Sequence, residues 1–529
     1  MPSRSSLLPR TVSVDSPGRS AALATAALVC LLASACASSS SGAKDGIPEG
    51  TVPMVRDLRV RDHDGGTNHR ILVRDGYWYQ TFSNQLLAID PRSTRAAAQI
   101  DITPFGKGGP ATDLAFARGR LWVVLARTGL AEFDLAEPRE PRLVALHTPE
   151  SLGILPRRVS VVGDDLYVSG ATGVVRWSDR RVFLPGQGPC GSVVGSTRGP
   201  VTCIGRDIVR LDDGAFVGSA IEVVELPAAP APSAARYIFA RQAASGAQIG
   251  LLDADLREVA SAAVPGALRS LRTFDGRLWT VSDTEITSFA IANDTLTDEQ
   301  PFRVRGARDV APLAPNILAV SGTFGRAMYR IEPEGTEPGD TFFNAHREAS
   351  GLSKAISDRR RVLAGGDEGN WIYLIGDRAE LTDRALDFTT VPARTATTSW
   401  GSAAIGKDDH GVRVLANGVE TLYVPEGDPL IGCVRDIDGD LWIGHEFGID
   451  VVGQGPDGTT RIGSVQFEGL VRWLFPKWDG GGVFVSEFGG FGTVEFVERP
   501  MTPEEIAAAN QAAQERAARA AAQQKEKSK

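Results

Sequence analysis

Short apolar runs separated by turn-forming residues recur along most of this chain. The clearest example lies at 434–452, where Asp438-Gly439 precedes one apolar run, 441–444, and a break at 446–448 precedes a second run, 449–452. Turn residues that tolerate positive φ between runs of β-forming residues predict a β-hairpin. Long helical periodicity is absent between about Val52 and Arg499. We therefore expect this region to be all-β.

The hairpin pattern recurs about every 40 residues, and each interval leaves room for two further strands. Clear copies begin at Asp75, Gly119, Asp164 and Asp275. A period of about 40–45 residues with four strands is typical of a β-propeller. Several runs, such as 121–124, are apolar on both faces. This double-sided apolar character is expected where neighbouring sheets pack face to face.

The repeat count and the chain ends bear on how the propeller closes. Counting gives about ten or eleven units, whereas propellers usually have about four to eight blades. The number of blades and of rings therefore stays open. The last unit has only two clear strands, at 483–486 and 493–497, and the chain start offers two more, at 55–60 and 70–74. Pairing them would complete a mixed blade and remove exposed sheet edges, which favours a single ring.

The best repeat, Asp438-Gly439-Asp440-Leu441-Trp442-Ile443-Gly444, resembles the D-G-x-L-W-[IV]-G propeller repeats of bacterial sensor ectodomains. Partial matches begin at Asp275 and Gly119. A weaker resemblance links Ala88-Ile89-Asp90 to the A-x-D of quinoprotein-type repeats, although the Thr-Gly and the docking Trp do not follow. These resemblances imply a β-propeller over most of the chain, and they transfer no active-site residue.

The N-terminus has the pattern of an export signal. Arginines at positions 4, 10 and 19 precede an apolar stretch at 21–32 and the small residues Ala33-Ser34-Ala35. A basic region, a short apolar region and small residues at the cleavage site predict a signal peptide over 1–35. The chain then divides into a linker at 36–51, a propeller at 52–499 and a helical tail at 500–529.

The residues around the cleavage site resemble a bacterial lipobox, Leu32-Ala33-Ser34-Ala35-Cys36, with Ala33 departing from the usual aliphatic residue. The resemblance implies that Cys36 is lipidated and anchors the protein to a membrane. A Ser/Gly-rich tract up to Gly50 would act as a flexible tether. With alanine at position 37, the implied location is the outer membrane, or the outer face of the plasma membrane in a cell with one membrane. Simple secretion after cleavage behind Ala35 is the alternative.

Export into an oxidising compartment bears on the remaining cysteines. Cys190 and Cys203 flank a turn signal at 195–199, and a hairpin turning at Ser196-Thr197 would place them face to face. This spacing predicts a disulfide between them. The alternative is two buried thiols that pack as small apolar groups. Cys433 has no evident partner.

The tail changes character at Pro500. Thr502-Pro503-Glu504-Glu505 has the pattern of a helix capping box, and an Ala/Gln/Arg-rich run follows to Gln524. Beyond alanine this run has almost no apolar face. We expect a solvated helix, with a small-residue helix docking on a partner as the alternative.

The sequence contains no H-E-x-x-H, C-x-x-C, G-x-S-x-G or phosphate-binding P-loop motif. The formal net charge is −9 and no basic block is present, so a nucleic-acid partner is not expected.

His63 and His69 could approach a metal, but a polar loop is the favoured interpretation. Asp436, Asp438 and Asp440 could form a calcium loop, but a generic turn is favoured. No cofactor is expected.

One turn recurs with similar side chains. His445-Glu446-Phe447-Gly448 is repeated as Ser486-Glu487-Phe488-Gly489, and Asp367-Glu368-Gly369 stands at the same place in another unit. In a propeller these turns fall on one rim. Carboxylates with phenylalanines beside them could bind a cation or a basic peptide there. The alternative is that duplicated repeats keep duplicated turns.

These features lead to two functional hypotheses. The first is a membrane-anchored envelope lipoprotein that acts as a non-enzymatic protein-binding or scaffold propeller with an envelope protein as partner. The second is a propeller enzyme, such as a lactonase, a lyase or a quinone-dependent oxidoreductase, with a metal in the central channel. A propeller fold alone does not decide between them.

Overall fold

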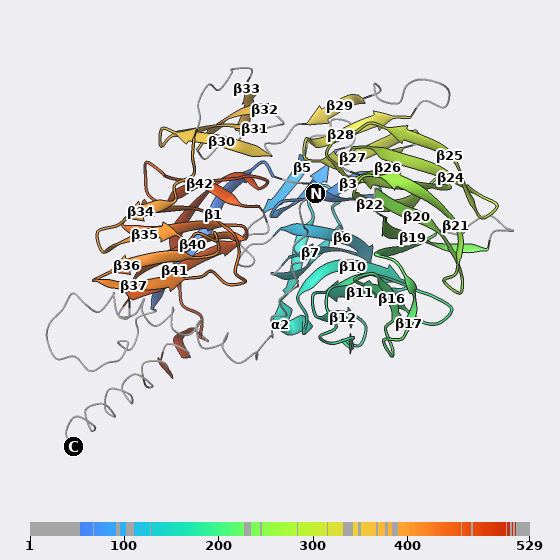
Figure 1. Cartoon of the computed structure of the whole chain (residues 1–529), viewed down its shortest axis with the longest axis horizontal. Helices are drawn as coiled ribbons and strands as arrows, with labels where there is room; N and C mark the ends of the chain where they lie inside the picture. Colours follow the sequence, from blue (N-terminus) through green and yellow to red (C-terminus); the bar gives the residue numbers. More distant parts are fainter. Residues whose placement is uncertain are drawn as a thin grey trace, which may run out of the picture.

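The chain folds into eleven four-stranded antiparallel sheets over the residues that the computed structural model describes (Figure 1). These residues are 53–514 without 67, 91–95, 102–109, 127, 227–233, 244–245, 283, 315, 332–341, 347–350, 367–368, 376–378, 383–389, 456–457, 467–468, 504, 508–509 and 512–513. The sheets are numbered here along the chain. The all-β propeller predicted from the sequence is confirmed.

Seven sheets are built from consecutive strands between positions 68 and 346. Their strands are, for sheet 1, β2 (Asn68–Arg74), β3 (Tyr77–Phe82), β4 (Gln85–Ile89) and β5 (Ala96–Asp101); for sheet 2, β6 (Ala111–Ala117), β7 (Arg120–Leu125), β8 (Gly129–Asp134) and β9 (Arg142–His147); for sheet 3, β10 (Pro156–Val162), β11 (Asp165–Gly170), β12 (Gly173–Arg176) and β13 (Val182–Phe183); for sheet 4, β14 (Cys190–Val194), β15 (Val201–Ile204), β16 (Asp207–Arg210) and β17 (Phe216–Ser219); for sheet 5, β18 (Glu222–Glu225), β19 (Ala235–Ala243), β20 (Gly246–Asp253) and β21 (Glu258–Pro265); for sheet 6, β22 (Leu268–Phe274), β23 (Arg277–Ser282), β24 (Ile286–Ala292) and β25 (Thr295–Phe302); and for sheet 7, β26 (Ala307–Ala314), β27 (Ile317–Gly322), β28 (Gly325–Arg330) and β29 (Phe342–His346). A single helical turn, α2 (Pro149–Leu152), precedes sheet 3.

Four further sheets follow, and the last of them recruits a strand from the start of the chain. Their strands are, for sheet 8, β30 (Leu352–Ser357), β31 (Arg361–Gly366), β32 (Gly369–Leu374) and β33 (Ala379–Thr382); for sheet 9, β34 (Thr395–Thr397), β35 (Gly401–Ile405), β36 (Val412–Ala416) and β37 (Val419–Tyr423); for sheet 10, β38 (Ile431–Ile437), β39 (Asp440–His445), β40 (Gly448–Gly455) and β41 (Gly458–Gln466); and for sheet 11, β42 (Val471–Pro476), β43 (Gly482–Ser486), β44 (Gly490–Pro500) and β1 (Met54–Asp64).

The Asp-Gly signals of the repeat are turns between the first and second strands of a sheet. Asp75 and Gly76 have φ of 50° and 78°, and Asp438 and Gly439 have φ of 55° and 84°. Positive φ at both central residues characterises the type I′ turn, whose twist matches that of the adjoining strands. The second strands that follow are buried along most of their length, as in β39. The apolar runs therefore form the centre of each sheet, covered on both faces.

The first seven sheets form a closed ring. The first strand of sheet 1, β2, lies against β6 of sheet 2 on one side and β26 of sheet 7 on the other. A separate hydrophobic cluster fills the space between every neighbouring pair, including sheets 7 and 1. The closing cluster packs Ile71 and Trp78 of sheet 1 against Ala319 and Met328 of sheet 7.

The other four sheets form a row in the order 8, 11, 10, 9 (Figure 1). Three hydrophobic clusters join them, between sheets 8 and 11, 11 and 10, and 10 and 9. The sequence favoured a single ring, and this expectation is corrected. The first seven repeats already bury the two faces of every sheet by closing on themselves, so the remaining repeats assemble separately.

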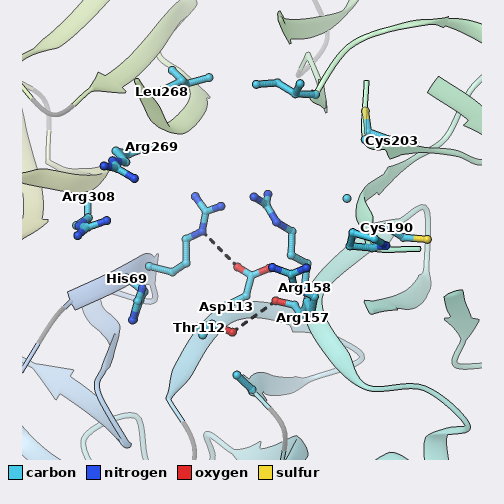
Figure 2. Close-up of a pocket in the computed structure, with 16 residues that line it drawn as sticks. His69, Thr112, Asp113, Arg157, Arg158, Cys190, Cys203, Leu268, Arg269 and Arg308 are labelled. Atoms are coloured by element: carbon cyan, nitrogen blue, oxygen red, sulfur yellow. Dashed lines mark hydrogen bonds and ion pairs between the residues drawn. The ribbon is translucent and has the colours of Figure 1, made fainter. Parts of the chain in front are cut away.

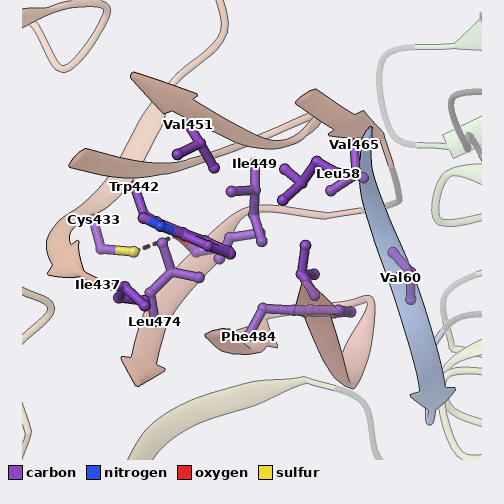
Figure 3. Close-up of a cluster of buried hydrophobic side chains, with 12 residues drawn as sticks. Leu58, Val60, Cys433, Ile437, Trp442, Ile449, Val451, Val465, Leu474 and Phe484 are labelled. Carbon is purple, nitrogen blue, oxygen red and sulfur yellow. Dashed lines mark hydrogen bonds between the residues drawn. The ribbon is translucent and has the colours of Figure 1, made fainter. Parts of the chain in front are cut away.

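Closure between the chain ends occurs within sheet 11. β1 pairs with β44 from Met54 opposite Pro500 to Asp64 opposite Phe491. Figure 3 shows Leu58 and Val60 of β1 packed against Trp442, Ile449 and Phe484 of sheets 10 and 11. The predicted mixed sheet is therefore present, but it takes one strand from the chain start. The second predicted strand, at 70–74, belongs to β2 and begins the ring.

A polar joint connects the ring to the row. His63 Nε2 donates to Gly489 O at 2.5 Å, and Asn84 Nδ2 donates to Gln466 O at 3.1 Å. Gln85 Nε2 donates to His63 O at 3.2 Å. His63, Asn84 and Gln85 are buried. His63 lies within β1, opposite Gly492, and His69 lies within β2, so the polar loop predicted for these two histidines is corrected.

The predicted capping box is present at the start of the tail. Thr502 N donates to Glu505 Oε2 at 2.8 Å, and Glu505 N donates to Thr502 Oγ1 at 3.3 Å. The described residues from Pro503 onward are helical. Across the part of the chain that the structure describes, no helix has both the length and the apolar character needed to cross a membrane.

Replacing Leu58 by alanine should destabilise the row, because Leu58 is 4% exposed within the cluster between sheets 10 and 11. Deletion of a buried leucine side chain typically costs about 2–5 kcal/mol of unfolding free energy. Urea unfolding followed by tryptophan fluorescence measures the loss. Leu422→Ala is the matched control, because Leu422 is 64% exposed. Equal, small losses for the two variants would contradict the packing role of β1.

Candidate functional site

The first strands of the seven ring sheets surround a cavity of about 710 Å³ (Figure 2). Six of these strands contribute residues, and Ile221, immediately before β18, contributes from sheet 5. The lining residues include His69, Arg70, Thr112, Asp113, Arg157, Arg158, Cys190, Cys203, Leu268, Arg269 and Arg308. The cavity is therefore the mouth of the ring's central channel, at the end where the first strands begin.

A bulge at the start of the first strands explains why consecutive residues reach this cavity. The register between first and second strands shifts near Pro156–Arg158 in sheet 3, and near Ala307–Asp309 in sheet 7. Equivalent shifts occur in sheets 1, 2, 4 and 6. A bulge inserts an extra residue and re-aims side chains that would otherwise alternate between faces. Arg157 and Arg158 can thus both line the cavity.

The cavity lining is strongly basic. Among the described residues it contains five arginines and one acidic side chain, Asp113. Figure 2 shows Arg269 and Arg308 on one side and Arg157 and Arg158 near the other. Arg157 and Arg269 are exposed, and Arg308 is half-buried. Guanidinium groups thus surround an open space from several sheets.

Beneath the mouth, a carboxylate joins three sheets across the ring closure. Asp309 of sheet 7 is fully buried and accepts from Ile71 N of sheet 1 at 2.9 Å. It also accepts from Ser270 Oγ at 2.5 Å and from Arg272 Nε at 2.9 Å, both in sheet 6. Arg70 Nη1 lies 3.8 Å from Asp309 Oδ1. Burial alone would raise the pKa of Asp309, but the Arg272 charge and hydrogen bonds outweigh this effect and lower the pKa.

Asp113 plays the equivalent role between sheets 2 and 3. Its Oδ2 accepts from Val159 N of β10 at 3.0 Å, as Asp309 accepts from Ile71 N of β2. Arg70 Nε lies 3.6 Å from Asp113 Oδ1. In both cases the carboxylate satisfies an amide beside the bulge of the next sheet. These bonds tie neighbouring first strands together around the channel.

A second ion pair crosses sheet 4. Arg158 Nη1 donates to Glu222 Oε1 of sheet 5 at 2.7 Å and to Ser192 Oγ at 3.3 Å. The Glu222 charge raises the pKa of Arg158. Burial would raise the pKa of Glu222, but the charges of Arg158 and Arg70 outweigh it and lower the pKa. Both groups therefore stay ionised and hold a fixed geometry.

Cys190 and Cys203 are buried free thiols, and the predicted disulfide between them is corrected. The bulge in β14 places Cys190 opposite Ile204, one residue from Cys203. Cys190 packs in the cluster between sheets 3 and 4, whereas Cys203 packs in the cluster between sheets 4 and 5. The two side chains thus point to opposite faces of sheet 4. Cys433 is also a buried free thiol.

The predicted rim turns are found in sheets 10 and 11. Glu446 N donates to Leu430 O and Glu487 N donates to Leu470 O, each just before the first strand of its sheet. In the ring, Ala171 N donates to Leu155 O in the same way. This backbone bond supports the alternative that the repeat keeps a structural turn.

The rim side chains differ in their surroundings. Glu446 is exposed, whereas Arg472 Nε donates to Glu487 Oε2 at 2.8 Å. Phe488 is 41% exposed and Phe447 is half-buried. Asp367 and Glu368 lie outside the described residues. Binding of a cation or basic peptide at this rim stays a prediction.

Two of the other candidate metal ligands, Asp436 and Asp438, accept backbone hydrogen bonds. Asp436 Oδ1 accepts from Gly439 N at 3.1 Å, and Asp438 Oδ2 accepts from Gly481 N at 2.8 Å. These bonds match the turn interpretation of this segment. His69 lies at the ring mouth, separate from the joint that holds His63. Within the described residues, no group of three or more His, Cys, Asp or Glu side chains is arranged to hold a metal ion.

Sequence reasoning missed the basic mouth. The sequence feature that could have predicted it is an arginine at the second or third position of several first strands, as in Arg70, Arg158, Arg269 and Arg308. These positions lie about one repeat or more apart, so no basic block appears in the sequence. Only the ring closure brings them together.

No protein-family model and no curated protein matches the sequence. Among solved structures, the chain is similar to the extracellular domain of the putative hybrid two-component system BT4673 from B. thetaiotaomicron, with 12% identity, a TM-score of 0.36 and coverage of 82% of this chain and 65% of that chain. It is also similar to PorZ, a surface component of the type-IX secretion system of Porphyromonas gingivalis, with 14% identity, a TM-score of 0.40 and coverage of 81% and 63%. The RRP9 WD40 repeats match with 12% identity, a TM-score of 0.39 and coverage of 50% and 91%. The chain thus spans slightly less than two thirds of the length of the two bacterial chains.

Replacing Asp309 by asparagine should destabilise the ring, because Arg272 and Arg70 lose their buried counter-charge. Removing one partner of a buried ion pair typically costs about 3–5 kcal/mol. The pKa of Asp309 is lower in the folded state than in the unfolded state. The stabilisation that its carboxylate provides is therefore fully present above the unfolded-state pKa, and it is lost as the pH falls through the folded-state pKa. Urea unfolding should therefore show a large difference between wild type and Asp309→Asn at pH 7 that shrinks at pH values below about 4.

Asp358→Asn is the control for this experiment, because Asp358 pairs with Arg361 at the surface. Exposed ion pairs contribute little to stability. If Asp309→Asn lowers the free energy of unfolding at pH 7 no more than the control does, the proposed role of Asp309 in ring closure is contradicted.

Proposed function

We propose that this protein is a membrane-tethered binding module of the cell envelope, in which the seven-sheet ring receives a protein partner at its mouth and performs no catalysis. The observation that carries this proposal is the basic cavity of about 710 Å³ where the seven sheets converge. Pockets of about 300–1,000 Å³ are typical of ligand sites, and rigid sheets hold the lining groups in place. The cavity is thus a pre-formed binding site for a protruding segment of a partner protein.

The chemistry of the lining supports binding rather than catalysis. Burial raises the pKa of Cys203 to about 12 and also raises that of Cys190. Thiols with raised pKa values are poor nucleophiles. Asp309 and Glu222 are held ionised by arginines and already accept hydrogen bonds. Groups arranged in this way fix geometry and charge, and they do not exchange protons near neutral pH.

The tether follows from the lipobox resemblance at Cys36. Cys36 and the predicted linker at 36–51 lie outside the described residues, so the tether rests on the sequence alone. The enzyme alternative, with a metal in the channel, gains no specific support from the described residues.

Replacing Cys36 by alanine should release the protein from membranes, because the lipid would have no acceptor. Fractionation of cells expressing the full chain, combined with labelled palmitate, measures attachment. We expect the wild-type chain in the membrane fraction with label, and Cys36→Ala in the soluble fraction without label. Ser39→Ala, in the same linker, is the matched control and should stay membrane-bound. Soluble wild-type protein without label would refute the tether and support simple secretion.

Partner capture tests the binding role and locates the surface. The full-length lipoprotein is purified in mild detergent from native envelopes, and co-purifying proteins are identified by mass spectrometry. The mouth variant Arg157→Gln with Arg269→Gln should lose at least about 90% of a near-stoichiometric partner, whereas the rim variant Glu446→Gln with Glu487→Gln should retain it. Loss by the rim variant alone would move the binding surface to sheets 10 and 11. Absence of any partner would refute the binding role.

A further inference from the structure

We infer that the mouth of the ring recognises an acidic peptide segment, whose carboxylates bind arginines on opposite sides of the channel. This inference rests on the proposed binding function and names the chemistry of the partner. It depends on three observations: the charge of the lining, the placement of the arginines around the channel, and the fixed network beneath them.

The charge of the lining selects an anionic ligand. Five arginines and one aspartate line the cavity, while the whole chain has a formal net charge of −9. The single aspartate, Asp113, already accepts from Leu114 N and Val159 N. A concave patch of one sign concentrates the field of its charges and attracts ligands of the opposite sign. A basic mouth on an acidic protein is thus a specific feature of this surface.

The placement of the arginines selects a ligand with several anionic groups. Arg269 and Arg308 come from the neighbouring sheets 6 and 7, and Arg157 comes from sheet 3 on another side of the ring (Figure 2). A single carboxylate cannot reach both sides of a cavity of this size. An extended peptide spans about 3.3 Å per residue and points alternate side chains in opposite directions. An acidic segment could therefore present carboxylates to both sides at once.

The network beneath the mouth prepares the arginines for this role. Arg158 is fixed by Glu222 and Ser192, and Arg70 Nη1 donates to Ser270 Oγ at 3.0 Å. The buried acids Glu222 and Asp309 thus hold the deeper arginines, Arg158 and Arg70, in a fixed arrangement beneath the mouth. Arginine is suited to carboxylates because its planar group can donate two parallel hydrogen bonds. Prior fixation of binding groups reduces the entropy lost on association.

Fluorescence anisotropy of a labelled hexapeptide of glutamate, titrated with the soluble chain 37–529, tests the inference. The expected result is saturable binding to wild type at 50 mM NaCl that weakens at least tenfold at 500 mM NaCl, because salt screens exposed charges. Arg157→Gln and Arg269→Gln should each weaken binding at least fivefold. These positions are exposed, so circular dichroism should show an unchanged fold.

Two controls separate the mouth from general charge attraction. Arg257→Gln removes an equal charge from the turn between β20 and β21 of sheet 5, where the Arg257 side chain is 72% exposed, and should change affinity less than twofold. The matching hexapeptide of glutamine should not bind. Equal weakening by Arg257→Gln and Arg157→Gln would overturn the inference.

Other outcomes distinguish this inference from the broader proposal. If inorganic phosphate or citrate displaces the peptide at concentrations equal to its own, the site serves small anions and the peptide inference fails. If the mouth variant loses its envelope partner but wild type does not bind the glutamate peptide, the binding function stands and the acidic-segment inference is wrong.

Discussion

The ring depends on the amide groups that the bulges leave beside the channel. A bulge disrupts the ladder between the first and second strands, and a buried amide without a partner is costly. The structure supplies the missing acceptor from the preceding sheet: Asp309 accepts from Ile71 N, and Asp113 accepts from Val159 N. In sheets 3 and 4, Ser160 Oγ accepts from Val193 N in the same manner. At these three interfaces, one sheet therefore completes the hydrogen bonding of the next.

This arrangement also determines the charge of the mouth. Two of the acceptors are carboxylates in a largely buried environment, where an ionised group requires a counter-charge. Arg272 and Arg70 supply it around Asp309, and Arg70 also supplies it for Asp113. The arginines near the start of the first strands thus lie beside the carboxylates that join neighbouring sheets. The basic mouth is a continuation of the interactions that hold the ring together.

The sequence predicted local structure well because the turns carry their own signals. Asp75-Gly76 and Asp438-Gly439 adopt the positive φ values that a type I′ turn needs. Thr502 and Glu505 form the predicted capping box for the same reason, since all interacting groups lie within one turn.

Long-range arrangement was much less accessible from the sequence. The one-residue shift at the bulge of β14 separates Cys190 from Cys203 onto opposite faces, and no spacing rule reveals such a shift. The division into a ring and a row depends on whether sheet 7 packs on sheet 1 or on sheet 8. Both alternatives use similar apolar faces, so the sequence pattern does not distinguish them. The basic mouth follows only once this choice is made.

The topology places the row at the mouth end of the ring. The chain forms β1 in sheet 11, then the complete ring, and then returns to the row, so the ring is inserted between two strands of one structural unit. The joint uses Asn84 in the turn between β3 and β4. The equivalent turn of sheet 2 contains Ala126, which lines the cavity. The row therefore stands at the same end of the ring as the mouth, beside sheet 1. The hydrogen bonds of His63, Asn84 and Gln85 hold the row beside this end of the ring.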